Sequence, residues 1–496
     1  MADRVNPSKV DYQEAWRKLR EDAARFLRPA FYLGQNLISR IGVVLTTTAG
    51  ITLIIAFGSL VLGYQPNPYA GILVYLILPA VFVVGLVLIP IGIYRDYRRQ
   101  RRLGTLPSAY PTVDFSHRGV RSTAVFVGVM TALNVPIFAI ASYSGTVYME
   151  STQFCGRTCH QVMQPEFTAY QRSPHARVAC VECHIGQGAP WFVRSKISGS
   201  YQVLAVTFDL YPRPIPTPIH NLRPARETCE QCHWPERFSG DKLVIKTKFA
   251  DDEKNSATKT VLLVHIGGRS LDRKLVGIHG RHLGLVTYLA PESKRQEIPW
   301  VSYRNEDGTF TDYASTETPP KPDLLAAGAR RTMDCMDCHN RPTHTFDMPE
   351  SAVNREMAAG RISSSLPFIH KVAIDLLKKN YTSRSSAQTE LPEALREYYR
   401  RNYFAIYTSQ RAQVDEAAKA LLYIYDGNVF TEMNITWGTY PNNLGHNDFP
   451  GCFRCHDGNH KAKSGAEITQ DCNACHSLLA MDDPDPKILH ELAGGE

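Results

Sequence analysis

The sequence predicts three N-terminal membrane-spanning helices, followed by a mainly helical region that has long loops and a small β insert. Three observations lead to this fold class. Three long uncharged runs stand near the N-terminus, the twelve cysteines form six pairs that each precede a histidine, and alternating polar and apolar residues follow the third pair. With 496 residues, 44% hydrophobic and 21% charged, the composition indicates two or three folded domains and excludes a mostly disordered chain.

Each of the three uncharged runs is long enough to cross a bilayer. A helix needs roughly 20 apolar residues to span a hydrocarbon core of about 30 Å. The runs contain 24, 26 and 27 residues and cover Ile41–Tyr64, Tyr69–Tyr94 and Ser122–Tyr148. The alternative is a buried helix of a soluble protein, but such helices rarely stay uncharged over this length. We therefore predict three transmembrane helices within residues 41–148.

Positive charge is confined to the segments that flank these runs. Residues 1–121 carry fifteen Lys and Arg against seven Asp and Glu, whereas residues 122–496 carry forty against forty-one. The positive-inside rule places the basic segment 1–40 and the basic loop 95–121 in the cytoplasm, and everything after Tyr148 on the outer side. Because the charge belongs to membrane flanks, it is not the footprint of a nucleic-acid partner.

The cysteine pairs carry the attachment signature of c-type haem. Five read Cys-x-x-Cys-His, and the first is one residue longer. In chain order the groups are Cys155/Cys159/His160, Cys180/Cys183/His184, Cys229/Cys232/His233, Cys335/Cys338/His339, Cys452/Cys455/His456 and Cys472/Cys475/His476. Two thiols at this spacing can add to the vinyl groups of one porphyrin, and the next histidine reaches its iron. The sequence therefore predicts six covalently bound haem c groups in a membrane-anchored multihaem cytochrome c.

Zinc and dithiol chemistry are the alternatives for these cysteines. Zinc ribbons close one site with two Cys-x-x-Cys halves and need no histidine after each half. A thioredoxin-like dithiol needs one such motif in a βαβ setting, whereas this chain has six pairs.

Each iron also needs a second axial ligand, which must come from outside the motifs. Several histidines lie close to a motif in sequence or in the long segment between the third and fourth motifs: His175, His220, His279, His282, His344, His446 and His460. Each is a candidate ligand, with a surface or structural role as the alternative, and we expect one of His279 and His282 to bind iron. His265, His370 and His490 are expected to be structural or exposed.

The residues around the first two motifs resemble the NapC/NirT family of membrane-anchored multihaem cytochromes. The resemblance covers about 150–235 and rests on the segments Phe154–Met163, Ser173–His175 and Cys180–His184. It implies a protein of the bacterial inner membrane that oxidises quinol at the outer face and passes electrons to periplasmic partners. A typical member has one anchor helix and four or five haems. The three runs and six motifs here are closer to the larger inner-membrane cytochromes of extracellular electron transfer.

The resemblance also implies residue roles. Met163 corresponds to the methionine that binds the first iron, with packing against the porphyrin as the alternative, and His175 to a histidine that serves another haem. Lys196 corresponds to the lysine of the quinol site, with Glu166 and Asp209 as weaker candidates for the proton acceptor. The segment 190–208 suits an interfacial helix and a slot for menaquinol or ubiquinol, and its alternative role is haem packing.

The motif spacing divides the chain into five expected parts. These are a cytoplasmic segment (1–40), the transmembrane region (41–148), a NapC/NirT-like domain with haems 1–3 (149–240), a β-rich insert (241–330) and a C-terminal domain with haems 4–6 (331–496). Alternation predicts strands at Lys242–Phe249 and Thr260–Ile266 and a hairpin over Val301–Tyr313. Apolar spacing predicts helices at about 350–360, 367–379, 391–402 and 409–425.

None of the three uncharged runs contains a histidine, so paired histidines cannot hold a haem inside the membrane. We therefore expect a hexahaem cytochrome that oxidises quinol at the outer surface and passes electrons to periplasmic cytochromes or reductases. Two alternatives stay open. A catalytic reductase of the nitrite or sulfur oxyanion type would need one iron with an open axial position. An electron-transfer subunit of a larger respiratory complex would have integral membrane partner subunits.

Overall fold

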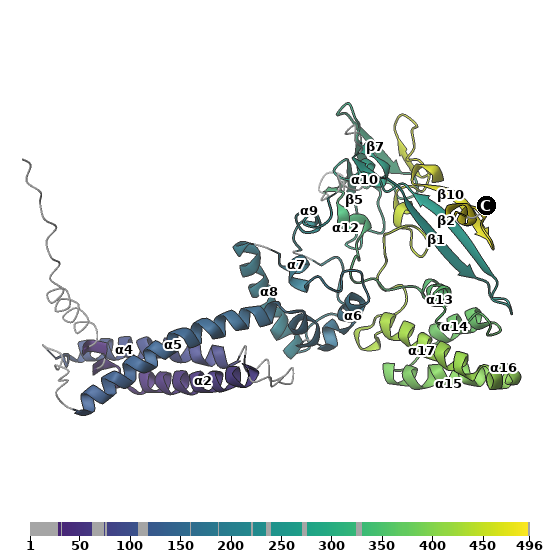
Figure 1. Cartoon of the computed structure of the whole chain (residues 1–496). Helices are drawn as coiled ribbons and strands as arrows, with labels where there is room; N and C mark the ends of the chain where they lie inside the picture. The colour runs from purple at the N-terminus through teal and green to yellow at the C-terminus, as the bar shows by residue number, and fades with distance from the viewer. Residues whose placement is uncertain are drawn as a thin grey trace, which may run out of the picture. The chain divides into compact units, whose positions relative to one another are not determined.

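The structure is a computed structural model that describes residues 28–30, 32–61, 74, 77–107, 118–158, 160–186, 188–219, 222–234, 240–269, 275–323 and 330–494. The chain divides into two compact units, Met1–Thr158 and Cys159–Glu496 (Figure 1). Each unit is described by itself.

Three long helices dominate the N-terminal unit: α2 (Leu37–Val61), α4 (Leu78–Leu103) and α5 (Arg118–Glu150). Small residues let α2 and α4 approach closely. A Cβ atom added to Gly85 would lie 2.7 Å from the backbone nitrogen of Thr46, and the Ser39 hydroxyl donates a hydrogen bond of 3.0 Å to the Ile89 carbonyl. Close packing through small residues is typical of membrane helices.

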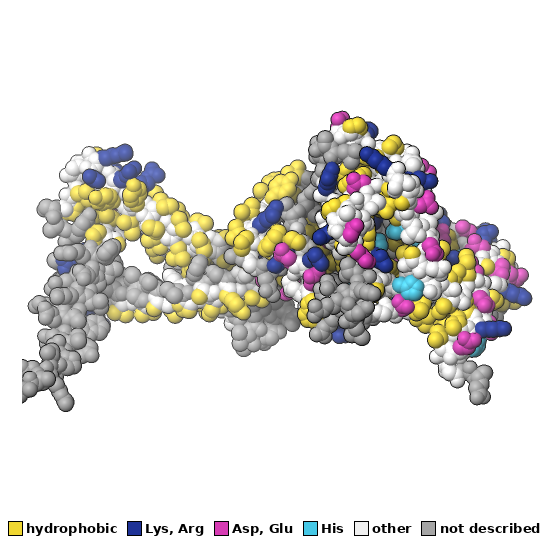
Figure 2. All heavy atoms as spheres, turned by 90° about the horizontal axis from the view of Figure 1, so that it is seen from above, with side chains coloured by type: hydrophobic (Ala, Val, Ile, Leu, Met, Phe, Trp, Pro, Cys, Tyr) yellow, Lys and Arg dark blue, Asp and Glu magenta, His cyan; other side chains and the backbone are white. Residues whose placement is uncertain are grey.

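Two stretches, Leu37–Ala56 and Leu78–Leu103, are long and apolar enough to cross a membrane. Figure 2 shows hydrophobic side chains along this unit, with basic side chains gathered at one end. The third expected span forms one helix of 33 residues, α5, but it is more polar and contains Pro136. A third membrane crossing therefore stays a prediction.

The basic residues after the second run continue the helix, whereas the sequence suggested a loop from residue 95. Helix α4 runs on to Leu103, with Arg101 and Arg102 in its last turn. Cations there interact favourably with the negative end of the helix dipole. The helix ends at Gly104, whose positive φ of 66° suits the left-handed cap conformation.

Short helices hold most of the motifs. The first lies partly on the π-helix η2 (Phe154–Thr158), at the end of the N-terminal unit. In the C-terminal unit the first segments are α6 (His160–Gln171), α7 (Cys180–His184), α8 (Ala189–Thr207), α9 (Ala225–Cys229), α10 (Gly277–His282) and α12 (Cys335–Cys338). The last two motifs lie on the 3-10 turns η5 (Gly451–Arg454) and η6 (Cys472–Ala474).

Antiparallel sheets form the second part of this unit. One has the strand order β1-β2-β10, from Lys242–Phe249, Ala257–Val264 and His476–Asp483. Another has the order β8-β5-β6-β7-β9, from Arg331–Thr332, Val286–Leu289, Trp300–Arg304, Phe310–Ser315 and His460–Ala462. Strands β3 (Gly268–Arg269) and β4 (Leu275–Val276) form a small pair.

The sheets confirm the expected strands and hairpin, but they do not respect the expected boundary at residue 330. The hairpin of β6 and β7 closes through the Asn305 amide, which donates to the Thr309 carbonyl at 2.8 Å. Strands β9 and β10 come from the expected C-terminal domain, and each completes a sheet begun before residue 320. Residues 241–330 are therefore not a separate insert.

Helices α13 (Pro349–Ala358), α14 (Ile369–Lys378), α15 (Arg384–Asn402), α16 (Phe404–Ser409) and α17 (Arg411–Asn428) enclose a hydrophobic core of their own (Figure 1). All four expected helices are present. Helix α15 begins seven residues before the predicted start, because Ser383 and Ser386 form a capping box there. The short η4 (Thr431–Met433) follows, and α18 (Lys487–Leu492) lies near the C-terminus.

Candidate haem-binding sites

Three motifs of the C-terminal unit close a tight helical turn at the histidine. The backbone amides of His233 and His339 donate to the carbonyls of Cys229 and Cys335, both at 2.8 Å, and His456 does the same to Cys452 at 3.1 Å. Residues three apart in such a turn lie on one face. Both cysteines of a pair therefore face the same side, and the histidine follows directly.

The two cysteines of the third motif differ in their surroundings, although we predicted both as points of haem attachment. Cys229 is half-buried at the end of α9, the helix that packs on α12 of the fourth motif. Cys232 instead lies beyond the end of this helix and is exposed, in a turn where its amide donates to the Cys229 carbonyl at 3.1 Å. An exposed thiol is accessible to a porphyrin vinyl group, as haem attachment requires. The attachment of haem to Cys232 stays a prediction. The other exposed cysteines of the described residues are Cys183, Cys452 and Cys472.

A second histidine lies opposite the motif histidine in five of the six motifs. The ring centres are 6.2 Å apart for His184 and His344, 6.0 Å for His233 and His175, 6.3 Å for His339 and His279, 5.8 Å for His456 and His282, and 6.3 Å for His476 and His446. The partners come from up to 174 residues away along the chain. Both His279 and His282 have a partner, whereas we expected only one of them to do so.

These separations suit an iron between two imidazoles. An imidazole nitrogen binds a metal at about 2 Å, so two rings on opposite sides of one ion have their centres about 6 Å apart. Among the described residues, no three His, Cys, Asp or Glu side chains gather as ligands of a bare ion. A porphyrin supplies four nitrogens itself, so two protein ligands are enough, and the residues fit haem.

Hydrogen bonds orient several of these rings. The Nδ1 atoms of His344, His282 and His456 lie 2.9, 2.7 and 2.7 Å from the carbonyls of Glu166, Ile278 and Thr469. Because a carbonyl only accepts, each Nδ1 carries the proton, and the lone pair is on Nε2. This is the tautomer in which Nε2 binds a metal.

Burial favours the neutral form of these rings. It lowers the pKa of His184, His339 and His282, and the neighbouring histidine of each pair lowers it further. Only a neutral imidazole has a lone pair to donate to iron.

A buried carboxylate holds the fourth motif in place. The Asp337 side chain, only 1% exposed, accepts hydrogen bonds from the Tyr288 hydroxyl at 2.6 Å, from Arg331 at 2.8 Å and from Arg295 at 3.0 Å. The Asp337 carbonyl also accepts from the buried Arg454 at 2.8 Å. Cations on two sides compensate the desolvated charge, so this network can fix the turn that carries Cys335 and Cys338.

Glu166 lies in a comparable network around His344. Its carboxylate oxygens are 3.0 and 3.1 Å from Arg341 Nη2, and its carbonyl accepts from His344. The Arg341 guanidinium is buried beside the rings of Phe346 and Tyr440. The carboxylate is therefore engaged in a partly buried ion pair, and its expected role as a proton acceptor for quinol stays a prediction.

The other expected quinol-site residues lie on or just after α8. Lys196 has its amine 4.6 Å from the centre of the Phe192 ring. Asp209 forms an ion pair with Arg213, and this hydrogen bond lowers the pKa of the Asp209 carboxyl.

Met163, the expected ligand of the first iron, is half-buried on α6. Cys159, His220 and the side chain of His160 lie outside the described residues.

His460 does not have the geometry of a ligand, contrary to the expectation. Its Nδ1 lies 2.8 Å from the Asp457 carboxylate, and its Nε2 lies 2.6 Å from the Ile298 carbonyl. Both nitrogens are therefore used in hydrogen bonds at the buried edge of the sheet. His265, His370 and His490 each contact an aspartate instead of a motif histidine.

Asp337 and Arg341 were missed at the sequence level, and the contacts of Glu166 were not foreseen. These residues contact motifs or candidate ligands across up to 178 residues of chain. An acidic residue inside a Cys-x-x-Cys motif, as in the fourth, was the one local signal, because a charge there must find partners when the motif is buried.

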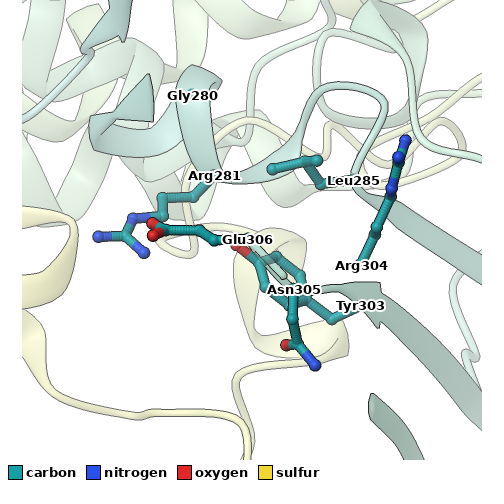
Figure 3. Close-up of a pocket in the computed structure, with 7 residues that line it drawn as sticks. All are labelled: Gly280, Arg281, Leu285, Tyr303, Arg304, Asn305 and Glu306. Atoms are coloured by element: carbon teal, nitrogen blue, oxygen red, sulfur yellow. The ribbon is translucent and has the colours of Figure 1, made fainter. Parts of the chain in front are cut away.

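A small cavity lies beside α10. It is lined by Gly280, Arg281, Leu285, Tyr303, Arg304, Asn305 and Glu306. Figure 3 shows the Arg281 and Glu306 side chains extending toward one another. Its volume of about 50 Å³ is enough to hold water. Pockets for larger molecules such as a quinol measure roughly 300 Å³ or more, so this cavity is too small for a quinol.

Comparisons with known proteins agree with this chemistry. The NapC/NirT cytochrome c family, N-terminal region, matches residues 118–213. The chain is 42% identical over 464 residues to the cytochrome c-type protein ImcH of Geobacter sulfurreducens, which covers 92% of this chain and 91% of ImcH. It is 28% identical over 105 residues to the cytochrome c-type protein NrfH of Wolinella succinogenes, which covers 21% of this chain and 59% of NrfH. No solved structure matches the chain.

The family match spans the third long helix and the first two motifs, and the similarity to ImcH extends over nearly the whole chain. The chain therefore belongs to the NapC/NirT family of membrane-anchored multihaem c-type cytochromes, which bind haem c covalently and transfer electrons.

Proposed function

We propose that this protein oxidises quinol at the outer face of the bacterial inner membrane and passes the electrons along six haem c groups to periplasmic cytochromes or reductases. The observation that supports this best is the set of five histidine pairs at motif turns, each with ring centres about 6 Å apart.

The ligand set follows from these pairs. The twelve motif cysteines would attach the haems, and the proximal ligands would be the six histidines that follow them. The distal ligands would be His344 for the second haem, His175 for the third, His279 for the fourth, His282 for the fifth and His446 for the sixth. Met163, three residues after His160, is our choice for the first. His460 is left without a role as a ligand, whereas His220 stays a candidate.

When bound, haem c supplies reversible one-electron chemistry at its iron. The paired histidines at five of the six sites would hold the haem from both sides and leave no place there for a substrate to bind iron. This filled coordination favours electron transfer over the alternative of a nitrite or sulfur oxyanion reductase.

An apolar stripe on α8 suits contact with lipid and quinol. Val193, Ile197, Tyr201 and Leu204 stand three or four residues apart, and so lie on one face of the helix. All four are exposed within their unit, Ile197 to 70%. An exposed stripe of this kind is expected on a helix that lies at a membrane interface.

Lys196 borders this stripe and is our choice for the contact with a quinol oxygen. Its cation can stabilise negative charge that develops on that oxygen as protons leave. Asp209 is a weaker base than an ordinary aspartate, because the Arg213 guanidinium lowers its pKa. It is better suited to holding Arg213 than to accepting a proton at neutral pH.

The test uses the full-length protein purified in detergent. Mass spectrometry and the pyridine haemochrome assay should count six haems, and a menaquinol analogue should reduce them. Lys196→Ala should slow reduction by quinol at least tenfold but leave reduction by dithionite unchanged. Lys254→Ala, at an exposed position in the turn between β1 and β2, serves as the matched control. Equal rates in the three proteins would contradict the proposed quinol site.

A further inference from the structure

Helix α10 carries two of the paired histidines three residues apart. The His279 ring lies opposite His339 of the fourth motif, nearly parallel to it at 16°. The His282 ring lies opposite His456 of the fifth motif. Because residues three apart on a helix have their Cβ atoms about 5–6 Å apart, the two sites must be close neighbours.

We infer that helix α10 supplies the distal ligands of two neighbouring haems, the fourth and the fifth. We also infer that these two belong to a row of haems that follows the order of the motifs. This inference rests on the proposed haem ligation and adds which sites are neighbours.

The cysteines of these two motifs support the same neighbourhood independently of α10. Cys338 and Cys455 pack against one hydrophobic cluster that includes Tyr288 and Met333. The attachment points of haems four and five therefore lie beside one another.

Contacts between other consecutive motifs extend the row in both directions. Helix α9 of the third motif packs on α12 of the fourth. Helix α7 of the second motif packs on α9 of the third.

The sixth site adjoins the fifth motif in a similar way. The His446 ring stacks on Phe453 at 4.2 Å between ring centres. Phe453 stands between the two cysteines of the fifth motif, and His446 faces His476 of the sixth. The row therefore runs from the second site to the sixth in chain order.

Backbone contacts fix the start of α10. The amides of Ile278 and His279 donate to the carbonyls of His265 and Ile266 at 2.9 and 3.0 Å. Gly267 and Gly277 both have positive φ, and a Cβ atom on Gly277 would lie 2.6 Å from the Gly267 Cα atom. No larger residue fits at Gly277 without displacing α10, and with it both histidines.

The experiment compares His279→Met, His282→Met and the double variant with the unaltered full-length protein. A methionine ligand raises the potential of a haem relative to a histidine ligand. Each single variant should change one low-spin signal in the EPR spectrum and raise one midpoint potential, and the two variants should change different haems. The double variant should change two. His490→Met, at an exposed histidine paired with Asp485, should change none.

Gly277→Ala distinguishes two ligands that are positioned by one helix from two ligands that are positioned independently. It should perturb both signals at once, because it moves the helix that carries both histidines. The inference would be overturned if the single variants altered the same haem or if neither altered any. A protein without covalent haem in the pyridine haemochrome assay would instead contradict the proposed function.

A second measurement uses the unaltered protein, so it does not depend on whether a variant folds. Cryo-EM of the unaltered protein should place α10 between the fourth and fifth irons, with these two as nearest neighbours. Another iron between them would overturn the inference, even if every haem has two histidine ligands.

Discussion

At the scale of single residues, the pair of Glu166 and Arg341 links the proposed ligand His344 to helix α6. The Arg341 guanidinium is buried and its charge is balanced by Glu166 at 3.0 Å. Removing one partner of such a pair leaves an uncompensated charge. The pair therefore stabilises the fold and holds the carbonyl that orients His344.

We predict that Glu166→Gln lowers the free energy of unfolding by about 3 kcal/mol, the range for breaking a buried ion pair. It should also shift the low-spin EPR signal of one haem, because His344 loses its fixed orientation. Denaturant titration and EPR of the purified protein measure the two effects. Glu416→Gln breaks a surface pair with Lys419 and should cost less than about 1 kcal/mol. Equal costs for the two variants would contradict this account.

His446 and His460 provide a second test at this scale, since they flank the same motif but differ in their contacts. His446 faces His476, whereas both nitrogens of His460 are hydrogen-bonded. We expect His446→Ala to produce a high-spin ferric signal from one haem. His460→Ala should leave the EPR spectrum unchanged and reduce only stability. A high-spin signal from His460→Ala would restore it as a ligand.

At the scale of elements, helices α13–α17 form a part of the molecule that contains no cysteine. Their core is made of fully buried leucines such as Leu391, Leu395 and Leu421. Because this core has no porphyrin to support it, its stability must come from side-chain packing alone.

Leu395→Ala should therefore lower the free energy of unfolding by about 3 kcal/mol, as large-to-small changes in packed cores do. The haem count and EPR spectrum should not change, since no proposed ligand lies on these helices. Far-UV circular dichroism during denaturation measures the loss. Phe404→Ala, at a side chain that is 66% exposed, is the control and should have a small effect. A loss of haem from Leu395→Ala would show that this core supports a haem site.

At the scale of the whole molecule, the route of the electrons determines whether turnover generates a membrane potential. No uncharged run contains a histidine, so the chain cannot hold a histidine-ligated haem within the bilayer. Under the proposed function, both protons and electrons from quinol leave on the outer side.

We predict that proteoliposomes containing the protein oxidise quinol without generating a membrane potential. The measurement follows a voltage-sensitive dye during reduction of an external soluble cytochrome. A proton-translocating quinol oxidase in parallel vesicles is the control for the dye. A voltage that develops in the absence of other proteins would contradict the proposed topology.

Local patterns were enough to predict much of the fold. The Cys-x-x-Cys-His spacing, the long apolar runs and the strand alternation at Lys242–Phe249 are short-range signals, because each reflects the chemistry of residues within one turn, span or strand. The start of α15 was predicted seven residues too late from apolar spacing, because the first turns of this helix are mainly polar and its cap is Ser383.

The sequence by itself determined the kind of cofactor and the apolar, basic-flanked character of the N-terminal region, since these depend on residue types at fixed spacing. The tertiary structure decided which histidine faces which motif, that α10 serves two of them, and that strands β9 and β10 complete sheets begun far earlier. The physical reason is that a distal ligand has only to reach the far side of a ring. It can come from any part of the chain that folds there, so its distance along the sequence carries little information.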